Sequence, residues 1–252
     1  MMKKMKYFVI RKIRAWSLKM VADAKLINKL REIVPDISRQ EPNTVLSDSY
    51  WELKRRAQHS FQCHLMLEAL KCMHISDKLS VIDAGDSAGT HILYLKGLAK
   101  IEADSLSVNI DPKAVEQIRS RGLKAVCDNI ETMVLDKVYD LCLCFQTAEH
   151  LYNPAVFFRS VRKHCCTMAI STPYMRNSRV GLYSIRAGCQ TKSDHIFELS
   201  PEDWILLLNH CGWEVLYSKT YYQYPKIPFL AYFWRRTDFE GFWGAVLRKK
   251  CQ

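Results

Sequence analysis

The sequence of 252 residues lacks several features that would place it in a familiar class. No apolar stretch reaches the length that crosses a bilayer. No two cysteines have Cys-x-x-Cys spacing, which argues against a zinc site of the usual kind. The basic N-terminal residues contain only a short apolar run and no evident cleavage site, so we expect no signal peptide. The sequence also has no internal repeat, no low-complexity tract and no signature of an RNA-binding module.

The charges and the cysteines narrow the choice of partner and compartment. The formal net charge of +11 favours an anionic partner: a nucleic acid, an anionic membrane surface or a phosphorylated substrate. A solvated basic surface without a partner is an equally good interpretation. Among the ten cysteines, Cys142 and Cys144 alternate within an apolar run, and the adjacent Cys165 and Cys166 are poorly placed to bridge each other. We therefore expect free thiols in a cytoplasmic protein.

The spacing of apolar residues predicts an α/β fold. Helical spacing predicts a basic N-terminal helix over about 1–33 and a second helix over 50–73. From residue 79, short strands alternate with helices, which predicts right-handed crossovers and a doubly wound, mostly parallel sheet with helices on both faces. The predicted strands cover 79–84, 105–111, 124–129, 139–146, 166–172 and 213–224, and the helices between them cover 89–100, 112–122, 153–164 and 200–212.

These elements divide the chain into three predicted parts. Residues 1–74 form an N-terminal helical extension, and residues 75–220 form the α/β domain. Residues 221–252 form a basic, aromatic C-terminal extension that packs on this domain.

The stretch "VIDAGDSAG", residues 81–89, marks the predicted ligand site. In a doubly wound sheet, ligands bind at the carboxyl ends of the strands, where the chain turns into a helix. Gly85 and Gly89 permit a close approach there because glycine lacks a Cβ and tolerates positive φ. Asp111 follows the second strand, where a carboxylate can accept both hydroxyls of a ribose, and Asp128 follows the third. The pattern indicates an adenosine-containing ligand.

Five segments of the chain resemble class I S-adenosylmethionine-dependent methyltransferases. They are "VIDAGDSAG", "VNIDPKAVEQI", "VCDNIE", "YDLCLCFQTAEHL" and "HIFELSPEDWILLLNHCGWEVL", which together span about residues 75–217. The resemblance implies a seven-stranded sheet and S-adenosylmethionine as cofactor. A dinucleotide enzyme fits less well because the Gly-x-Gly-x-x-Gly pattern is absent.

The resemblance also implies which residues hold the cofactor. One departs from the family pattern, because Ser87 stands where the central glycine of the first motif is usual. Serine fits this position if its φ is negative. The implied cofactor residues are Asp83, Gly85, Ser87, Gly89, Asp111, Asp128 and Gln146.

The predicted catalytic residues follow the fourth strand and the long loop after the fifth. Methyl transfer to a hydroxyl requires an aligned acceptor and usually a base. His150 and His195 are the candidate bases, and Glu149 and Glu198 orient them. An alternative is that Glu149 and His150 only shape the pocket. Relatives that bind a divalent ion carry a glutamate where this chain has Gln146, so we expect no metal.

The acceptor is less well defined by the sequence. Four cations, Arg176, Arg179, Arg186 and Lys192, lie in the long loop and favour an anionic acceptor, although a solvated loop explains them equally well. Aromatic and basic residues at both ends of the chain suit peripheral contact with the inner membrane face or stacking on single-stranded nucleic acid, although packing of both ends onto the domain explains them better. The predicted function is therefore O-methylation of a small or a glycan- or lipid-linked acceptor. The alternatives are an RNA methyltransferase and a non-catalytic binding protein that retains the fold.

Overall fold

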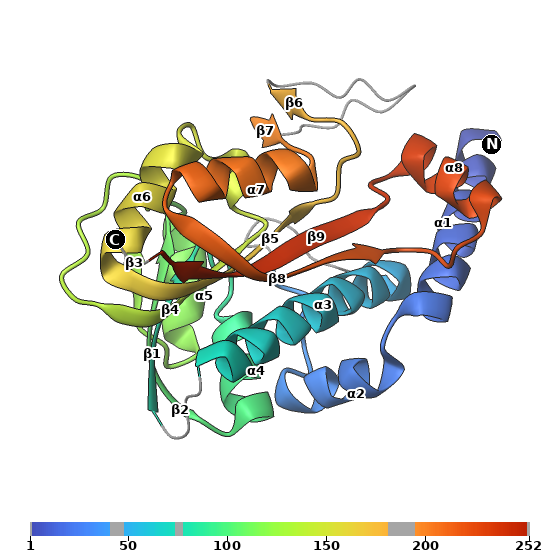
Figure 1. Ribbon diagram of the computed structural model, residues 1–252. Coiled ribbons are helices and arrows are strands. Elements are labelled where there is room, and N and C mark those ends of the chain that lie inside the picture. The colour runs from blue at the N-terminus through green and yellow to red at the C-terminus, as the bar shows by residue number, and fades with distance from the viewer. Residues whose placement is uncertain (1, 41–47, 74–77, 181–194, 251–252) are drawn as a thin grey trace.

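A seven-stranded sheet forms the centre of the protein (Figure 1). The computed structural model describes residues 2–40, 48–73, 78–180 and 195–250. The strands of this sheet are β1 (Lys78–Ala84), β2 (Glu102–Asn109), β3 (Ala125–Cys127), β4 (Tyr139–Phe145), β5 (Cys165–Pro173), β8 (Trp213–Tyr222) and β9 (Gly241–Lys249). Their order is β3-β2-β1-β4-β5-β9-β8, and only the pairings of β9 with β5 and β8 are antiparallel. The predicted mostly parallel sheet of seven strands is confirmed.

Helices cover both faces of the sheet and bury two apolar cores. Strand β4 serves both cores, since Leu141, Leu143 and Phe145 face one of them and Cys142 and Cys144 face the other. The first core also takes residues from α2 (Ala24–Ile33), α3 (Ser49–Met73), α4 (Thr90–Ala99) and α5 (Pro112–Ser120). The second takes residues from α6 (Pro154–His164) and α7 (Pro201–His210). Alternation on a central strand therefore fixes which helices lie on which face.

The N-terminal segment contains two helices where the sequence predicted one. Helix α1 (Met2–Val21) ends before Asp23, and the side chain of Asp23 accepts a hydrogen bond from the backbone N–H of Leu26 at the start of α2. This N-cap satisfies a donor that the new helix leaves without an intrahelical partner. The prediction of one helix over 1–33 is therefore wrong at residues 22–23.

The C-terminal residues complete the sheet instead of packing on its outside. After α8 (Pro228–Thr237), strand β9 inserts between β5 and β8. A Cβ on Gly244 would lie 2.3 Å from Leu65 Cδ1 of α3, so β9 and α3 pack in close contact. The predicted boundaries at residues 74 and 220 therefore do not separate independent parts, because the sheet and its helical layer extend across both.

Three further observations complete the description of the fold. None of the helices in the described segments has the length and apolar character that a membrane span requires. The eight cysteines that the structure describes are all free, and five of them are buried. The two-stranded ribbon of β6 (Arg179–Val180) and β7 (Phe197–Glu198) lies apart from the main sheet.

Candidate functional site

Two cavities meet at the carboxyl ends of β1 and β4. The larger, of about 900 Å³, is lined by residues from the ends of β1, β2, β3 and β4, among them Gly85, Asn109 and Asp128. The smaller, of about 360 Å³, lies between the end of β4, helix α3 and the start of β9. Gln146 and His150 line both cavities. They form a shared wall at the point where the strand order reverses, which is where doubly wound sheets bind ligands.

The glycine turn after β1 is as tight as the sequence predicted. Gly85 has φ +86°, and a Cβ there would lie only 2.3 Å from Thr147 Oγ1. Thr147 is itself held by a 2.9 Å hydrogen bond from its hydroxyl to the carbonyl of Ala84. Gly89 has φ +72° and precedes α4. Ser87 is not among the residues with positive φ. A serine can replace the usual central glycine of the motif only under this condition.

Asp86 holds this turn from inside, a role that the sequence analysis missed. Its buried carboxylate accepts hydrogen bonds from the backbone N–H groups of Ala88 and Gly89 and from the Ser107 hydroxyl. An aspartate two residues before such amides is a recognisable turn signal. By contrast, the buried carboxylate of Asp83 lies 3.6 Å from His91 Nδ1, and burial raises its pKa to about 7. Neither Asp83 nor Ser87 is among the residues that line these two cavities.

The acids after β2 and β3 differ in position. Asp128 lines the larger cavity, as expected for a cofactor residue. Asp111 does not; its side chain caps α5 by accepting the backbone N–H of Lys113 at 2.9 Å. Asn109 occupies the cavity wall at the end of β2, with its Nδ2 donating to the carbonyl of Asp86. The Asp-Pro pair at residues 111–112 is an N-cap signal that identifies this role.

The shared wall contains a strained residue. Gln146 has φ +54°, a left-handed conformation that is uncommon for residues other than glycine. Its side-chain amide donates to Ser171 Oγ at 3.2 Å, and its backbone N–H donates to the carbonyl of the same serine. These bonds to β5 hold the side chain between the two cavities. Strain of this kind persists where the surrounding structure fixes it, and it clusters at functional sites.

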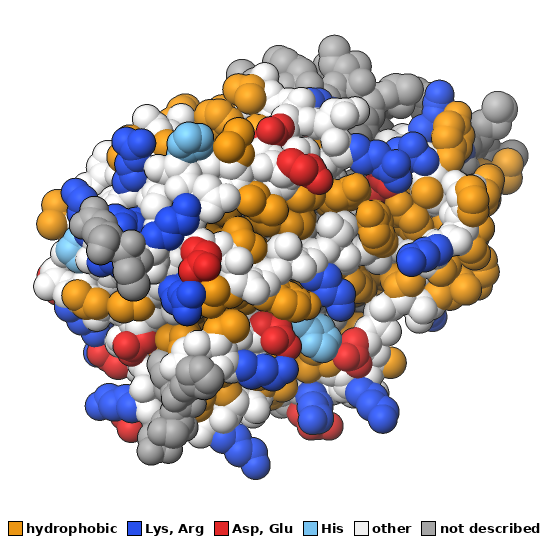
Figure 2. Space-filling view, in the orientation of Figure 1, with side chains coloured by type: hydrophobic (Ala, Val, Ile, Leu, Met, Phe, Trp, Pro, Cys, Tyr) orange, Lys and Arg blue, Asp and Glu red, His pale blue; other side chains and the backbone are white. Residues whose placement is uncertain are grey.

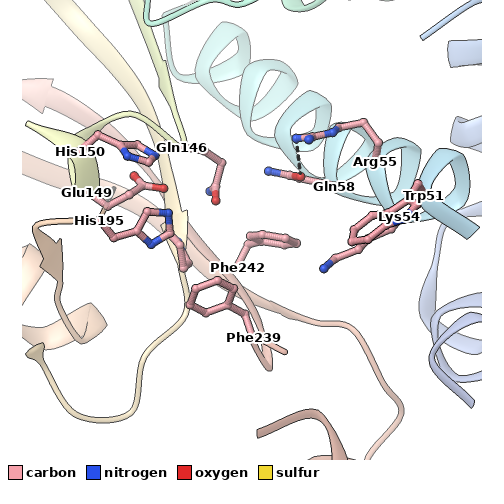
Figure 3. A pocket seen from close by; sticks show the side chains of 11 residues that line it. Trp51, Lys54, Arg55, Gln58, Gln146, Glu149, His150, His195, Phe239 and Phe242 are labelled. Carbon is pink, nitrogen blue, oxygen red and sulfur yellow. Dashed lines mark hydrogen bonds between the residues drawn. The ribbon is translucent and has the colours of Figure 1, made fainter. Parts of the chain in front are cut away.

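Three ionisable side chains gather beside this wall (Figure 3). Ile196 donates its backbone N–H to the carbonyl of Glu149 at 2.7 Å, which brings the segment of β7 against the short 3-10 helix 148–150. The rings of His150 and His195 then meet edge to face with 4.6 Å between centroids. His195 Nδ1 lies 3.0 Å from Glu198 Oε1, and Glu198 also pairs with Arg179. Glu149, His150 and His195, the predicted catalytic residues, all line the smaller cavity, and their catalytic role stays a prediction.

Glu149 is unusual among the acids of the protein. Its side chain is fully buried, and neither carboxylate oxygen has a hydrogen-bond partner in the described part of the chain. Burial raises the pKa of its carboxyl to about 7, an effect that His195 opposes. Ligand atoms of Glu149, His150 and His195 all lie within 4.8 Å of one another. The three side chains are therefore close enough to share one metal ion.

Helix α3 supplies the opposite wall of the smaller cavity, which the sequence did not reveal. In Figure 3 the side chains of Trp51, Lys54, Arg55 and Gln58 face the glutamate and the two histidines across the space. Phe239 and Phe242, which flank the start of β9, line it between them. Arg55 donates to Gln58 Oε1 at 3.3 Å, and Lys54 pairs with Asp238. The wall thus combines aromatic surface, an amide and cationic groups.

The cations of the long loop are only partly described. Arg176 makes a bidentate pair with Glu240, with distances of 2.8 and 3.0 Å, and Arg179 pairs with Glu198. These two arginines are therefore already paired with glutamates of the fold. The argument for an anionic acceptor, which relied partly on them, is weaker as a result. Arg186 and Lys192 lie outside the described residues.

Comparisons with known proteins agree with this geometry. Residues 82–167 match the family model of a methyltransferase domain. An S-adenosylmethionine-dependent methyltransferase from Clostridium acetobutylicum is 11% identical, with a TM-score of 0.52 over 75% of this chain and 91% of that chain. No curated protein matches the sequence.

Two further structures carry S-adenosylhomocysteine. A polyketide-synthase O-methyltransferase from Brevibacillus brevis is 12% identical, with a TM-score of 0.55 over 85% of this chain and 80% of that chain. The 1,6-didemethyltoxoflavin N1-methyltransferase from Burkholderia thailandensis is 13% identical, with a TM-score of 0.54 over 74% and 79%. One transfers to oxygen and the other to nitrogen, so the shared fold leaves the acceptor atom open.

Proposed function

We propose that this chain, a class I methyltransferase that uses S-adenosylmethionine, methylates a hydroxyl group of a glycan acceptor. The observation that carries the proposal is the wall of Gln146 and His150 that separates two cavities. In this proposal the larger cavity holds the cofactor and the smaller one holds the acceptor. The wall is then the place where a methyl group passes from one to the other.

The larger cavity fits the cofactor in size and lining. Its volume of about 900 Å³ lies within the range of small-molecule sites. Ile110, which is 72% exposed, and Ile130 supply apolar surface for an adenine ring, and Asp128 and Asn129 supply polar groups beside it. The tight turn at Gly85 allows the backbone to approach the amino-acid end of the ligand. When bound, S-adenosylmethionine supplies an electrophilic methyl group on a sulfonium.

The smaller cavity suits a sugar better than a flat apolar acceptor. Trp51, Phe239 and Phe242 offer rings on which the apolar face of a sugar can pack, while Gln58 and Arg55 offer hydrogen-bond donors for its hydroxyls. A hydroxyl that approaches Gln146 from this side reaches the group of Glu149, His150 and His195. These three side chains are the titratable residues described at the wall, so we assign to them the activation of the hydroxyl.

A lipid-linked glycan agrees with the surface formed by α1 and α8. These helices lie side by side, joined by a 2.9 Å hydrogen bond from Trp234 Nε1 to Ser17 Oγ, and neither contains an acidic residue. Figure 2 shows hydrophobic and basic side chains together on this side of the molecule. Exposed apolar residues interleaved with cations suit an anionic lipid surface. The exposed apolar and aromatic side chains are Met5, Tyr7, Phe8, Val9, Trp16 and Met20 on α1, and Phe229 and Tyr232 on α8.

A methyl-transfer assay tests the proposal. The protein is incubated with S-adenosylmethionine that carries a deuterated methyl group, and with free, phosphorylated and lipid-linked glycans and RNA as acceptors. We expect the label on a glycan oxygen, as an ether. Label on RNA with strongly salt-dependent binding would favour the RNA methyltransferase instead. Cofactor binding without transfer to any hydroxyl acceptor would contradict the proposal.

A further inference from the structure

A chain of polar side chains runs through the core from the end of β1 to the wall between the two cavities. Gln146 Nε2 donates to Ser171 Oγ at 3.2 Å, and Gln62 Nε2 of helix α3 donates to the same oxygen at 3.3 Å. Gln62 Oε1 lies 2.9 Å from His91 Nε2 of α4. His91 Nδ1 in turn lies 3.6 Å from Asp83 Oδ2 of β1. All of these residues except Gln146 are buried, so the chain is closed off from solvent up to the wall.

The place of this chain in an otherwise apolar core needs an explanation. His91 packs against the ring of Phe145, and the neighbours of Gln62 on α3 include Phe61 and Leu65, which belong to the first core. Buried polar groups are costly unless each is hydrogen-bonded, and an apolar side chain at Gln62 would fill the space without that requirement. Proteins break such rules mainly at functional sites. The end of the chain at Gln146, with its φ of +54°, has the character of such a site.

We propose that Gln62 is a positioning residue for the wall. It holds the hydroxyl of Ser171, and Ser171 holds the side chain of Gln146 between the larger and the smaller cavity. The carbonyl of Ser171 also accepts the backbone N–H of Gln146 at 2.8 Å, so one serine fixes this strained residue at two points. The proposal rests on the proposed function only for what the two cavities bind.

The hydrogen atoms of His91 set the direction of the bonds in the chain. Because Gln62 Oε1 can only accept, His91 Nε2 donates to it, and Nδ1 faces the carboxyl of Asp83. Neither Nδ1 nor Asp83 Oδ2 has a hydrogen-bond partner in the described segments, so the two atoms hold one proton between them. When the pair loses that proton to solvent, the remaining hydrogen moves to Nδ1 and Nε2 becomes an acceptor. The amide of Gln62 must then turn over, and its oxygen accepts from the Ser171 hydroxyl.

This change falls near neutral pH. Burial and the neighbouring Asp86 carboxylate raise the pKa of Asp83 to about 7, and His91 opposes the rise. The ring of His59 on α3 lies 5.3 Å from that of His91, and burial holds the pKa of His59 well below its usual value, so it stays neutral. Two thiols of β4 also interact with Asp83. They are neutral too, because a hydrogen bond with Cys165 and burial raise the pKa of Cys142 and burial raises that of Cys144.

Nuclear magnetic resonance of the side-chain amides tests the proposal without an acceptor. The signals of Gln62 and Gln146 are assigned by their absence from Gln62→Met and Gln146→Met. In the wild type we expect both signals to shift with one midpoint near pH 7. Gln62→Met keeps the shape of the side chain and removes its hydrogen bonds, so the Gln146 signal should leave its wild-type position and no longer follow the pH. The matched control is Ser60→Ala, which removes another buried hydrogen bond of α3 and should leave the Gln146 signal unchanged.

Transfer kinetics add a readout that a purely structural role would not change. Gln62→Met should lower the rate of transfer to the glycan acceptors about tenfold or more, while affinity for S-adenosylhomocysteine stays within about threefold. A Gln146 signal that is independent of pH in the wild type, a test that needs no variant, would overturn the proposal. A signal unmoved in Gln62→Met, or transfer at the full rate in that variant, would overturn it as well.

Addition of S-adenosylhomocysteine tests the proposed function separately. The ligand should move the Gln146 signal in the wild type, because Gln146 lines the larger cavity. If the ligand binds without moving that signal, the assignment of the cavities is refuted, while a common titration of Gln62 and Gln146 would still support the positioning chain.

Discussion

His150 and His195 stand edge to face with ring centroids 4.6 Å apart, although they come from separate segments of the chain. The hydrogen bond from the Ile196 backbone N–H to the carbonyl of Glu149 holds those segments together at 2.7 Å. The relationship matters because His150 also lines the larger cavity, which we assign to the cofactor. In that assignment the pair of imidazoles lies beside both reactants.

The first prediction concerns Glu198, which orients His195 without lining either cavity. Glu198→Gln should lower the rate of methyl transfer by about tenfold or more, because His195 loses the carboxylate that fixes its ring. Affinity for S-adenosylhomocysteine should stay within about threefold. A methyl-transfer assay and calorimetry measure the two effects. An unchanged transfer rate would mean that Glu198 does not position the histidine.

The second prediction concerns the glycine turn. Gly85→Ala should reduce cofactor affinity by tenfold or more and lower the unfolding temperature, because the new Cβ would collide with Thr147 Oγ1. Gly122→Ala is the matched control: φ is also positive at +74°, but nothing lies within 4 Å of the added carbon. It should cost only the backbone strain, about 1 kcal/mol. Equal effects of the two changes would show that the close approach at Gly85 is unimportant.

The third prediction separates the two acids after β2 and β3. Asp111→Ala removes a helix cap and should lower the free energy of unfolding by about 1 kcal/mol with little change in cofactor affinity. Asp128→Ala should lower cofactor affinity with little change in the free energy of unfolding, because Asp128 lines the larger cavity. Urea unfolding and titration with S-adenosylhomocysteine distinguish them. A large loss of affinity in Asp111→Ala would restore the sequence-based assignment of the ribose contact.

The fourth prediction is a pH dependence. Burial raises the pKa of Glu240, but hydrogen bonds from Arg176 and Tyr224 outweigh it, so the pKa lies below its usual value. The ionised Glu240 therefore stabilises the fold above its unfolded pKa of about 4.3, and this contribution disappears as the pH falls through the folded pKa.

Glu240→Gln should cost about 1–2 kcal/mol at pH 7, a discounted value because the Arg176 side chain is 50% exposed. The difference from wild type should shrink below about pH 4. The control is Glu214→Gln, whose partner Arg248 and own side chain are both exposed, and which should change stability by less than about 0.5 kcal/mol. Urea unfolding at several pH values measures both, and a pH-independent difference would contradict the account.

The fifth prediction concerns the surface of α1 and α8. The double change of Phe8 and Trp16 to Asp should abolish sedimentation with vesicles that contain anionic lipid, because both side chains are more than half exposed on a basic helix. Val134→Asp, at an apolar residue that is 87% exposed elsewhere, should sediment like the wild type. Sedimentation that survives the double change would exclude this surface as the contact.

The sequence predicted local features well because they depend on neighbouring residues. The alternation of strands and helices and the positive φ at Gly85 and Gly89 both appear in the structure. Strand β9 was missed because its aromatic residues also suit a tail, and its antiparallel pairing with β5 depends on contacts distant in sequence.

At the candidate site, too, local features were predicted and features that depend on tertiary packing were not. His150 and His195 were both predicted as candidate bases from their places after the fourth strand and in the long loop, and the structure brings their rings together. Residues that reach the site by tertiary packing were missed, such as those of α3 in the smaller cavity, because helical spacing alone does not separate a cavity wall from a core face. The sequence analysis placed Asp111 at the cavity, but Asn109, two residues earlier, lines it instead. Asp111 is the N-cap of α5, and this becomes clear only when the start of that helix is known.

The position of the sulfur atom in a complex with S-adenosylhomocysteine tests the central claim most directly. A crystal structure of that complex should place the sulfur in the larger cavity against Gln146 and His150, with the smaller cavity on the other side of these residues. A sulfur atom on the far side of the larger cavity, or a ligand bound elsewhere, would contradict the shared wall and the transfer that we derive from it.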